Sequence, residues 1–239
     1  MVARQRIEQQ PAFVLHTQPW RETSLIVELF SRDHGRLPLV AKGARRPASA
    51  FRGLLLGFQP LLADWSGGGE VRTLARVEWQ GGVPLLGGRA LLSGYYLNEL
   101  LISLMPREDA HPGLFDDYRA ALLELASGKP VEGALRRFEF ALLAAMGYMP
   151  DFGRCADTGA ALAEGRDYLL IIEKGFAERP RGSGTPSYSG RILRALSHGN
   201  FADEACAVAA KQISRTLINH HLGGRELQSR RVFTEFAEL

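Results

Sequence analysis

The stretch AFVLHTQPWRETSLIVELFSRDHGRLPLVA, residues Ala12–Ala41, contains three short segments rich in β-branched, aromatic and leucine residues. These segments are Ala12–Thr17, Ser24–Phe30 and Arg36–Ala41, and polar links separate them. Runs of this composition divided by turn-rich links are typical of consecutive β-strands. The stretch therefore predicts that the chain opens with a β-domain.

Two further strands are expected before residue 80. Leu55–Trp65 is largely apolar, and Pro60 within it suggests a bulge or a sheet edge. After a glycine-rich turn at Gly67–Gly69, small or β-branched residues recur at every second position up to Val77. This alternation is typical of a β-strand with one buried face. Five short strands with tight connections suit a small barrel, and the five-stranded OB-fold is one of few such solutions. Residues 1–80 are therefore predicted to form an OB-fold domain.

The middle of the chain changes to the period of α-helices. Apolar positions predict helices over Arg89–Met105, from Pro112 onward, and from Val131 to Gly147. Short links between three such helices predict an antiparallel bundle, so residues 81–150 are expected to form a helical domain.

The last third of the chain is less regular. Residues 151–190 show no clear periodicity, whereas Asp203–Leu222 has the pattern of a helix, and Ser229 is expected to cap a final short one. Residues 191–239 are expected to pack on the helical domain. The fold class is therefore multidomain α+β, with an N-terminal five-stranded OB-fold barrel followed by α-helices.

The composition and the motifs limit the classes of protein to which this chain can belong. The chain has 239 residues, 46% of them hydrophobic, which is enough to bury a core. No run of 18 apolar residues and no secretory pattern is present, so a cytoplasmic protein without a membrane partner is expected. The sequence also lacks phosphate-loop, nucleophile-elbow and zinc-protease motifs, so no catalytic residue is assigned.

No metal or other cofactor is expected from the residue spacing. Cys155 has no second cysteine two to four residues away, as a structural zinc site needs. Cys206 lies in an alanine-rich helix, where a free cysteine behaves as a small apolar residue. His220 and His221 are adjacent, so on a helix they point about 100° apart and cannot chelate one ion together.

Charge is distributed unevenly along the chain. Residues 1–80 hold 11 basic and 7 acidic side chains, residues 81–180 hold 10 and 14, and residues 181–239 hold 8 and 5. The formal charges are therefore +4, −4 and +3. Basic ends around an acidic middle suggest a polyanionic partner such as nucleic acid.

A cationic loop is expected between the third and fourth strands. No acidic residue occurs from His34 to Leu62, and the loop segment Ala41–Gly53 carries four cations. Arginine can contact phosphate with two parallel hydrogen bonds, so the loop is a candidate DNA-binding surface, although an ordinary solvated loop is the alternative. Trp20 and Phe51 could stack on bases of a single strand or pack in the core.

A second basic group lies near the C-terminus, where a solvated helix face is the alternative interpretation. The full set of candidate DNA-binding residues is Arg36, Lys42, Arg45, Arg46, Arg52, Lys211, Arg215, Arg225, Arg230 and Arg231.

Seven motifs in order make the chain resemble the bacterial recombination mediator family RecO. They are FVLHTQPWRETSL, LVAKGARR, GEVRTL, LNELL, ALRRFEFALLAAMGY, EKGF and LGGRELQSRRVF. The resemblance implies an OB-fold, a helical domain and a third region that binds zinc through four cysteines in some members. Only Cys155 occupies that cysteine pattern here, so residues 151–190 are expected to be a degenerate, metal-free zinc-finger-like region.

The resemblance also implies a function. RecO-like proteins bind single- and double-stranded DNA, anneal complementary strands, contact the acidic C-terminal tail of the single-stranded-DNA-binding protein SSB, and with RecR help to load RecA. Such a protein is not an enzyme, and it would be associated with the nucleoid.

The SSB tail is acidic and ends in apolar residues. Its receptor should therefore pair a cation with a hydrophobic pocket. Arg136 is nominated first, with Arg137, Leu135 and Phe138 beside it; an ion pair between Arg136 and Glu132 is the alternative. A protein-docking adaptor with incidental DNA contacts and an RNA-binding OB-fold protein remain alternative functions.

Overall fold

The computed structural model describes residues 6–180, 186–201 and 203–237. They form two compact units. Unit 1 holds residues 6–129 and 227–237, and unit 2 holds residues 130–226. The boundary thus falls inside the stretch that the sequence suggested as one helical domain.

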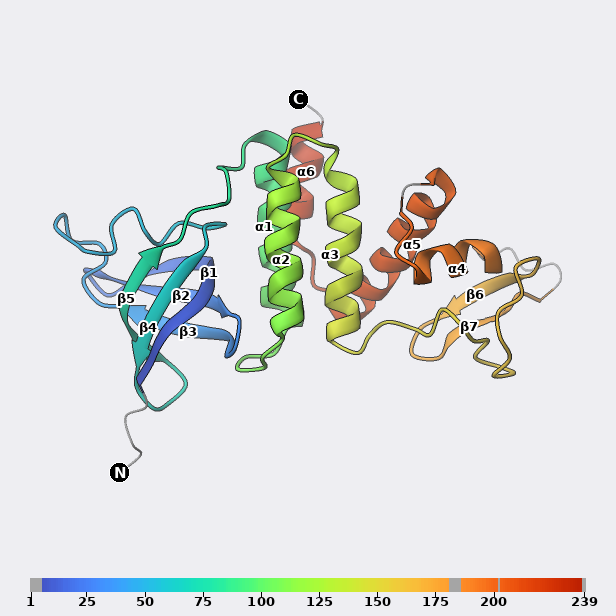
Figure 1. Ribbon diagram of the computed structural model, residues 1–239, viewed down its shortest axis with the longest axis horizontal. Helices are drawn as coiled ribbons and strands as arrows, with labels where there is room; N and C mark the ends of the chain where they lie inside the picture. Colours follow the sequence, from blue (N-terminus) through green and yellow to red (C-terminus); the bar gives the residue numbers. More distant parts are fainter. Residues whose placement is uncertain (1–5, 181–185, 202, 238–239) are drawn as a thin grey trace. The chain divides into compact units, whose positions relative to one another are not determined.

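Unit 1 begins with a closed five-stranded barrel, the strands labelled β1 to β5 in Figure 1. Its strands are β1 (Arg6–Trp20), β2 (Ser24–Ser31), β3 (Gly35–Ala41), β4 (Leu61–Ser66) and β5 (Arg72–Trp79). The strand order is β1-β2-β3-β5-β4, and only the β3–β5 pairing is parallel. The expected OB-fold barrel is confirmed. The fourth strand starts later than expected, at Leu61, since Pro60 has no amide hydrogen to donate to a sheet.

The long first strand serves two neighbours, which closes the barrel. Its second half pairs with β2, from Ala12 opposite Ser31 to Trp20 opposite Ser24. Its first half pairs with β4, from Arg6 opposite Ser66 to Ala12 opposite Leu61. Small and branched side chains, with one tryptophan, fill the interior: Ala12, Val14, Val27, Leu29, Leu37, Leu39, Ala41, Leu61, Ala63, Trp65, Leu74 and Val77.

One outer face of the barrel is buried as well, because helix α2 (Pro112–Leu125) covers it. The ring centroid of Phe13 lies 5.2 Å from that of Phe115 and 5.0 Å from that of Tyr118, and Phe30 lies 5.4 Å from Phe115. This explains why β1 and β2 contain apolar runs rather than strict alternation.

A buried hydrogen-bond chain joins the barrel to the helices of unit 1. Asn98, in helix α1 (Gly88–Leu104), donates from Nδ2 to the Leu15 carbonyl oxygen at 2.8 Å. It accepts from the Tyr118 hydroxyl at 2.5 Å. Burial raises the pKa of Tyr118, so the phenol remains the donor.

The last helix, α6 (Gln228–Ala237), lies beside α1 (Figure 1). The expected cap at Ser229 is wrong, because Ser229 lies inside the helix. The Glu99 carboxylate of α1 accepts hydrogen bonds from the amides of Gln228 (2.7 Å) and Ser229 (2.9 Å) and from the Ser229 hydroxyl (2.5 Å). A carboxylate from another helix therefore caps the positive end of α6.

Glu99→Ala should loosen α6 from its first turn, because the helix loses its capping acceptor. We expect a loss of about 0.5–2 kcal/mol in local stability, measured as faster hydrogen exchange at the α6 amides. Glu99→Gln keeps one acceptor oxygen and should lose less. Equal exchange in the wild type and in Glu99→Ala would refute this capping role.

Unit 2 combines helices with a small sheet. It contains α3 (Val131–Ala145), β6 (Asp167–Ile171), β7 (Gly175–Glu178), β8 (Tyr188–Ser189), α4 (Gly190–Ser197) and α5 (Glu204–His221). Helix α5 packs on α3 and α4, and the sheet order is β7-β6-β8. The helix expected over Asp203–Leu222 is confirmed, with the Asp203 side chain accepting from the Cys206 amide at its start. The C-terminal helices divide between the units: α5 packs on α3, whereas α6 packs on α1.

Residues 151–190 were expected to be a degenerate zinc-finger-like region. In its described part, aromatic packing and backbone hydrogen bonds connect the chain. Phe152 and Phe176 pack with ring centroids 5.0 Å apart, and buried Cys155 is hydrogen-bonded through its amide to the Ala160 carbonyl oxygen. A hydrogen bond from Thr158, three residues on, lowers the pKa of the Cys155 thiol. No group of three or more potential ligands could hold a metal ion within residues 6–180, 186–201 and 203–237. One cysteine does not fit a four-cysteine zinc site.

Candidate nucleic-acid interface

The loop between β3 and β4 is ordered by a series of tight turns. Successive amide-to-carbonyl hydrogen bonds of 3.0–3.1 Å join Arg46 to Gly43, Ser49 to Arg46, Arg52 to Ser49, and Leu54 to Phe51. Gly43 has a φ of +68°, which glycine adopts without strain, and this allows the first turn. The backbone of the loop is therefore internally hydrogen-bonded.

Apolar side chains anchor the same loop on the barrel. Ala44, Phe51, Leu54 and Leu55 are partly buried against the barrel core. Phe51 is thus a packing residue, the core alternative left open by the sequence. Because the loop's apolar residues face the core, its charged residues are left at the surface.

We call the side chains of Lys42, Arg45, Arg46 and Arg52 the cationic loop. All four are exposed. Within the described part of the chain, none of them forms an ion pair with a carboxylate. Instead, Arg45 Nη1 donates to the Glu22 carbonyl oxygen at 3.2 Å, and Arg52 Nη1 donates to the Pro47 carbonyl oxygen at 3.0 Å. Carbonyl oxygens orient a guanidinium without cancelling its charge, so the loop keeps a formal charge of +4.

The turn between β1 and β2 adds a cation that the sequence pattern did not indicate. Arg21 is exposed and lies next to the point where Arg45 Nη1 reaches the Glu22 carbonyl oxygen. Arg21 lies outside the acid-free window and directly precedes Glu22. In the sequence, the acidic neighbour therefore gave no sign of an uncompensated positive charge. The pairing of β2 with β3, which sets Leu25 opposite Ala41, brings this turn beside the cationic loop.

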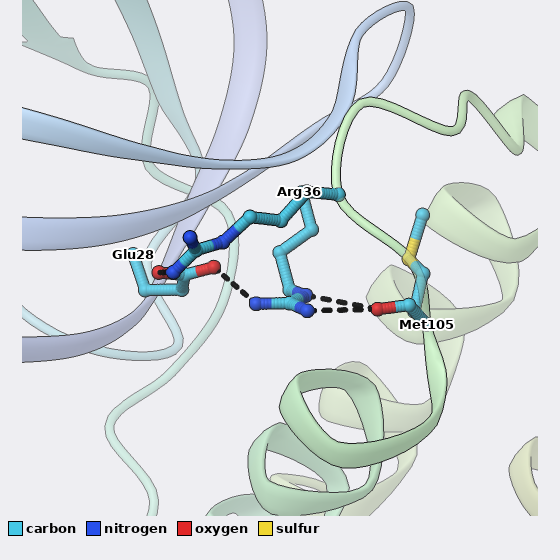
Figure 2. A network of polar contacts seen from close by, with 4 residues as sticks. Glu28, Arg36 and Met105 are labelled. Atoms are coloured by element: carbon cyan, nitrogen blue, oxygen red, sulfur yellow. Dashed lines mark hydrogen bonds and ion pairs between the residues drawn. The ribbon is translucent and has the colours of Figure 1, made fainter. Parts of the chain in front are cut away.

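Arg36, which the sequence placed in the DNA-binding set, belongs to a largely buried polar network instead (Figure 2). Its Nε and Nη2 donate to the Met105 carbonyl oxygen at 3.1 and 2.9 Å, and its Nη1 pairs with the Glu28 carboxylate. The side chains of Arg36 and Glu28 are 12% and 11% exposed. Arg36 therefore links β3 to the end of α1, and we remove it from the phosphate-binding set.

Arg136, nominated for the SSB tail, is also largely buried. Its Nη2 donates to Glu139 Oε1 at 2.6 Å and its Nη1 to Ser214 Oγ at 3.1 Å, which ties α3 to α5. The side chains of Arg136 and Glu139 are 12% and 1% exposed. Phe138 is buried in the core, whereas Leu135 is half-buried and Arg137 exposed. The four candidates thus divide into two surface residues and two interior ones.

The C-terminal cations do not form one group. Lys211 and Arg215 are exposed on one face of α5, and Arg225 follows that helix in unit 2. Arg230 and Arg231 belong to unit 1. The Arg230 guanidinium lies 5.8 Å from the centre of the Tyr96 ring, so it contributes to the packing of α6 on α1.

Comparison with known proteins covers nearly the whole chain. The protein-family model described as Recombination protein O N terminal matches residues 5–82. The family model described as Recombination protein O C terminal matches residues 85–231. The chain belongs to the RecO family. The DNA repair protein RecO of Azoarcus sp. (strain BH72) is 56% identical over 243 residues, covering 100% of both chains. The DNA repair protein RecO of Dechloromonas aromatica (strain RCB) is 50% identical over 244 residues, again covering 100% of both.

The RecO family supplies the general role, which is in DNA repair and recombination, and it is not a known enzyme family. The resemblance stated from the sequence motifs is confirmed. In the described residues, no helix combines the length and apolar character needed to cross a bilayer.

Proposed function

We propose that this RecO-family chain binds single- and double-stranded DNA through the cationic loop and anneals complementary strands. The observation that carries the proposal is a set of four exposed cations, fixed on a barrel and paired with no described carboxylate. DNA phosphates would replace water around these cations, and the counterions condensed on the DNA would be released. This favours binding whatever the base sequence of the DNA. The relatives are named DNA repair proteins, which supports DNA rather than RNA.

Annealing requires no catalytic group. Two complementary strands repel each other through their phosphates, and a protein that neutralises both lowers this barrier. Lys211 and Arg215 on α5 offer a second exposed basic face, on unit 2. We propose that the cationic loop and this second face contact different DNA strands.

We further propose that the chain docks the acidic SSB tail, acts with RecR and thereby promotes RecA loading in the nucleoid. The family supports this role. On unit 2, exposed Arg137 and half-buried Leu135 offer the tail a cation beside apolar surface. Arg136, tied to Glu139 and Ser214, would hold α3 in place for that contact.

The double variant Arg45→Glu/Arg46→Glu tests the DNA site. Each phosphate contact contributes about 0.7 to the log–log salt slope on single strands and about 0.9 on duplex. Loss of two contacts should therefore lower the slopes by about 1.4 and 1.8, and weaken single-strand binding about 25-fold at 0.1 M salt. Fluorescence anisotropy with labelled oligonucleotides across a salt series measures both quantities.

The matched control is Arg119→Glu/Lys129→Glu, which makes the same change in net charge on exposed residues of unit 1 outside the loop. We expect its DNA affinity and slope to stay close to the wild type, because neither residue belongs to the proposed phosphate site and no phosphate contact is lost. Equal losses in both variants, or none in the loop variant, would contradict a phosphate site at the cationic loop.

A further inference from the structure

The tip of the β1–β2 hairpin presents an exposed tryptophan. Trp20 is 43% exposed and ends β1, opposite Ser24. The Arg21 guanidinium carbon lies 6.0 Å from the centre of the indole ring, within the range of a cation–π contact. A large flat ring at the surface, next to a cation, is the arrangement that can stack on an unpaired base beside its phosphate.

Hydrogen bonds join the hairpin tip to the start of the cationic loop. The Arg45 amide donates to the Thr23 carbonyl oxygen at 2.8 Å, and Arg45 Nη1 donates to the Glu22 carbonyl oxygen at 3.2 Å. The Gly43 amide donates to Ser24 Oγ at 3.4 Å. Trp20 and the phosphate-binding cations therefore belong to one continuous surface.

The other candidate aromatic residues do not share this position. Trp65 is fully buried in the barrel, and Phe51 packs on the core. Trp79 is 60% exposed, but it pairs with Leu61, which in turn lies opposite Ala12, eight residues before Trp20 in β1. Trp79 therefore lies at another part of the barrel and serves as a control.

We propose that Trp20 stacks on a base of single-stranded DNA and gives the cationic loop a preference for single strands over duplex. The inference rests on the proposed DNA-binding function. The loop's cations meet phosphates on either form of DNA, whereas the bases of a duplex are already stacked on one another. Trp20 thus adds affinity only where bases are free.

The test compares Trp20→Ala, Trp20→Phe and Trp79→Ala in the full chain, with an oligo-dT strand and a blunt duplex of equal length. Trp20→Ala should bind the single strand about 5- to 150-fold more weakly, which is the range of base–aromatic stacking. Its salt slope should not change, because no phosphate contact is lost. Duplex affinity should stay at the wild-type value, Trp20→Phe should recover most single-strand affinity, and Trp79→Ala should match the wild type. Quenching of tryptophan fluorescence by oligo-dT should also disappear in Trp20→Ala.

Two results would overturn the inference. The first is an unchanged single-strand affinity in Trp20→Ala. The second is an equal loss of affinity for single strand and duplex, which would indicate that Trp20 only supports the structure of the hairpin. Failure of the proposed function is distinct, because Arg45→Glu/Arg46→Glu would then leave both DNA forms bound as before. If that double variant weakens both forms and Trp20→Ala weakens neither, only the stacking inference fails.

Discussion

Arg36→Ala is expected to destabilise unit 1 by about 3–5 kcal/mol, the usual loss when one partner of a buried ion pair is removed. The variant leaves the Glu28 carboxylate, 11% exposed, with only the 3.5 Å contact to Arg107 among its described ion pairs. The Met105 carbonyl oxygen, at the end of α1, also loses both Arg36 donors. A largely buried carboxylate that keeps only the longer contact to Arg107 and a carbonyl oxygen that loses two donors both lower the stability of unit 1.

Denaturant unfolding followed by tryptophan fluorescence measures this loss. All three tryptophans belong to unit 1, and Trp65 in the barrel core changes from a buried to a solvated state. Arg76→Ala is the control, since Arg76 pairs with Glu78 on the exposed surface of β5 and should lose less than about 1 kcal/mol. A stable Arg36→Ala variant with a lower DNA salt slope would instead return Arg36 to the phosphate-binding set.

The contrast between Arg36 and Arg45 shows what the sequence could predict. Both lie in the same acid-free window, and both carry the charge that phosphate requires. Their environments differ through partners that the window does not contain: Arg36 meets Glu28, eight residues earlier, and Met105, 69 residues later. Local composition identified the basic loop, whereas tertiary contacts decided which arginine is neutralised.

The barrel was predictable because its five strands lie within the first 80 residues and their strand-forming segments are separated by recognisable polar and glycine-rich links. The division into two units was not, because α2 and α3 have similar amphipathic patterns and a short link between them. The periodicity of a helix shows that one face is buried but not which unit buries it. For the same reason, the cap of α6 by Glu99, 129 residues before Gln228, had no local signal.

Arg136→Ala should destabilise unit 2 by about 3–5 kcal/mol, because it leaves the Glu139 carboxylate, 1% exposed, without its arginine. Faster hydrogen exchange throughout α3 and α5 would report this loss, since Arg136 also joins the two helices through Ser214. A simple loss of SSB-tail binding in this variant would therefore not show that Arg136 touches the tail.

The double variant Arg136→Met/Glu139→Met separates folding from recognition, because replacing a buried ion pair with apolar residues of similar size is often neutral or stabilising. If Arg136 only holds α3 in place, this variant keeps wild-type affinity for a labelled SSB-tail peptide. Arg137→Ala, at the exposed neighbour, should then weaken the peptide about tenfold, as expected for a lost hydrogen bond between charged groups. A well-folded double variant that no longer binds the peptide would instead make Arg136 the direct contact, because only its charge, and not its support of α3, would have been removed.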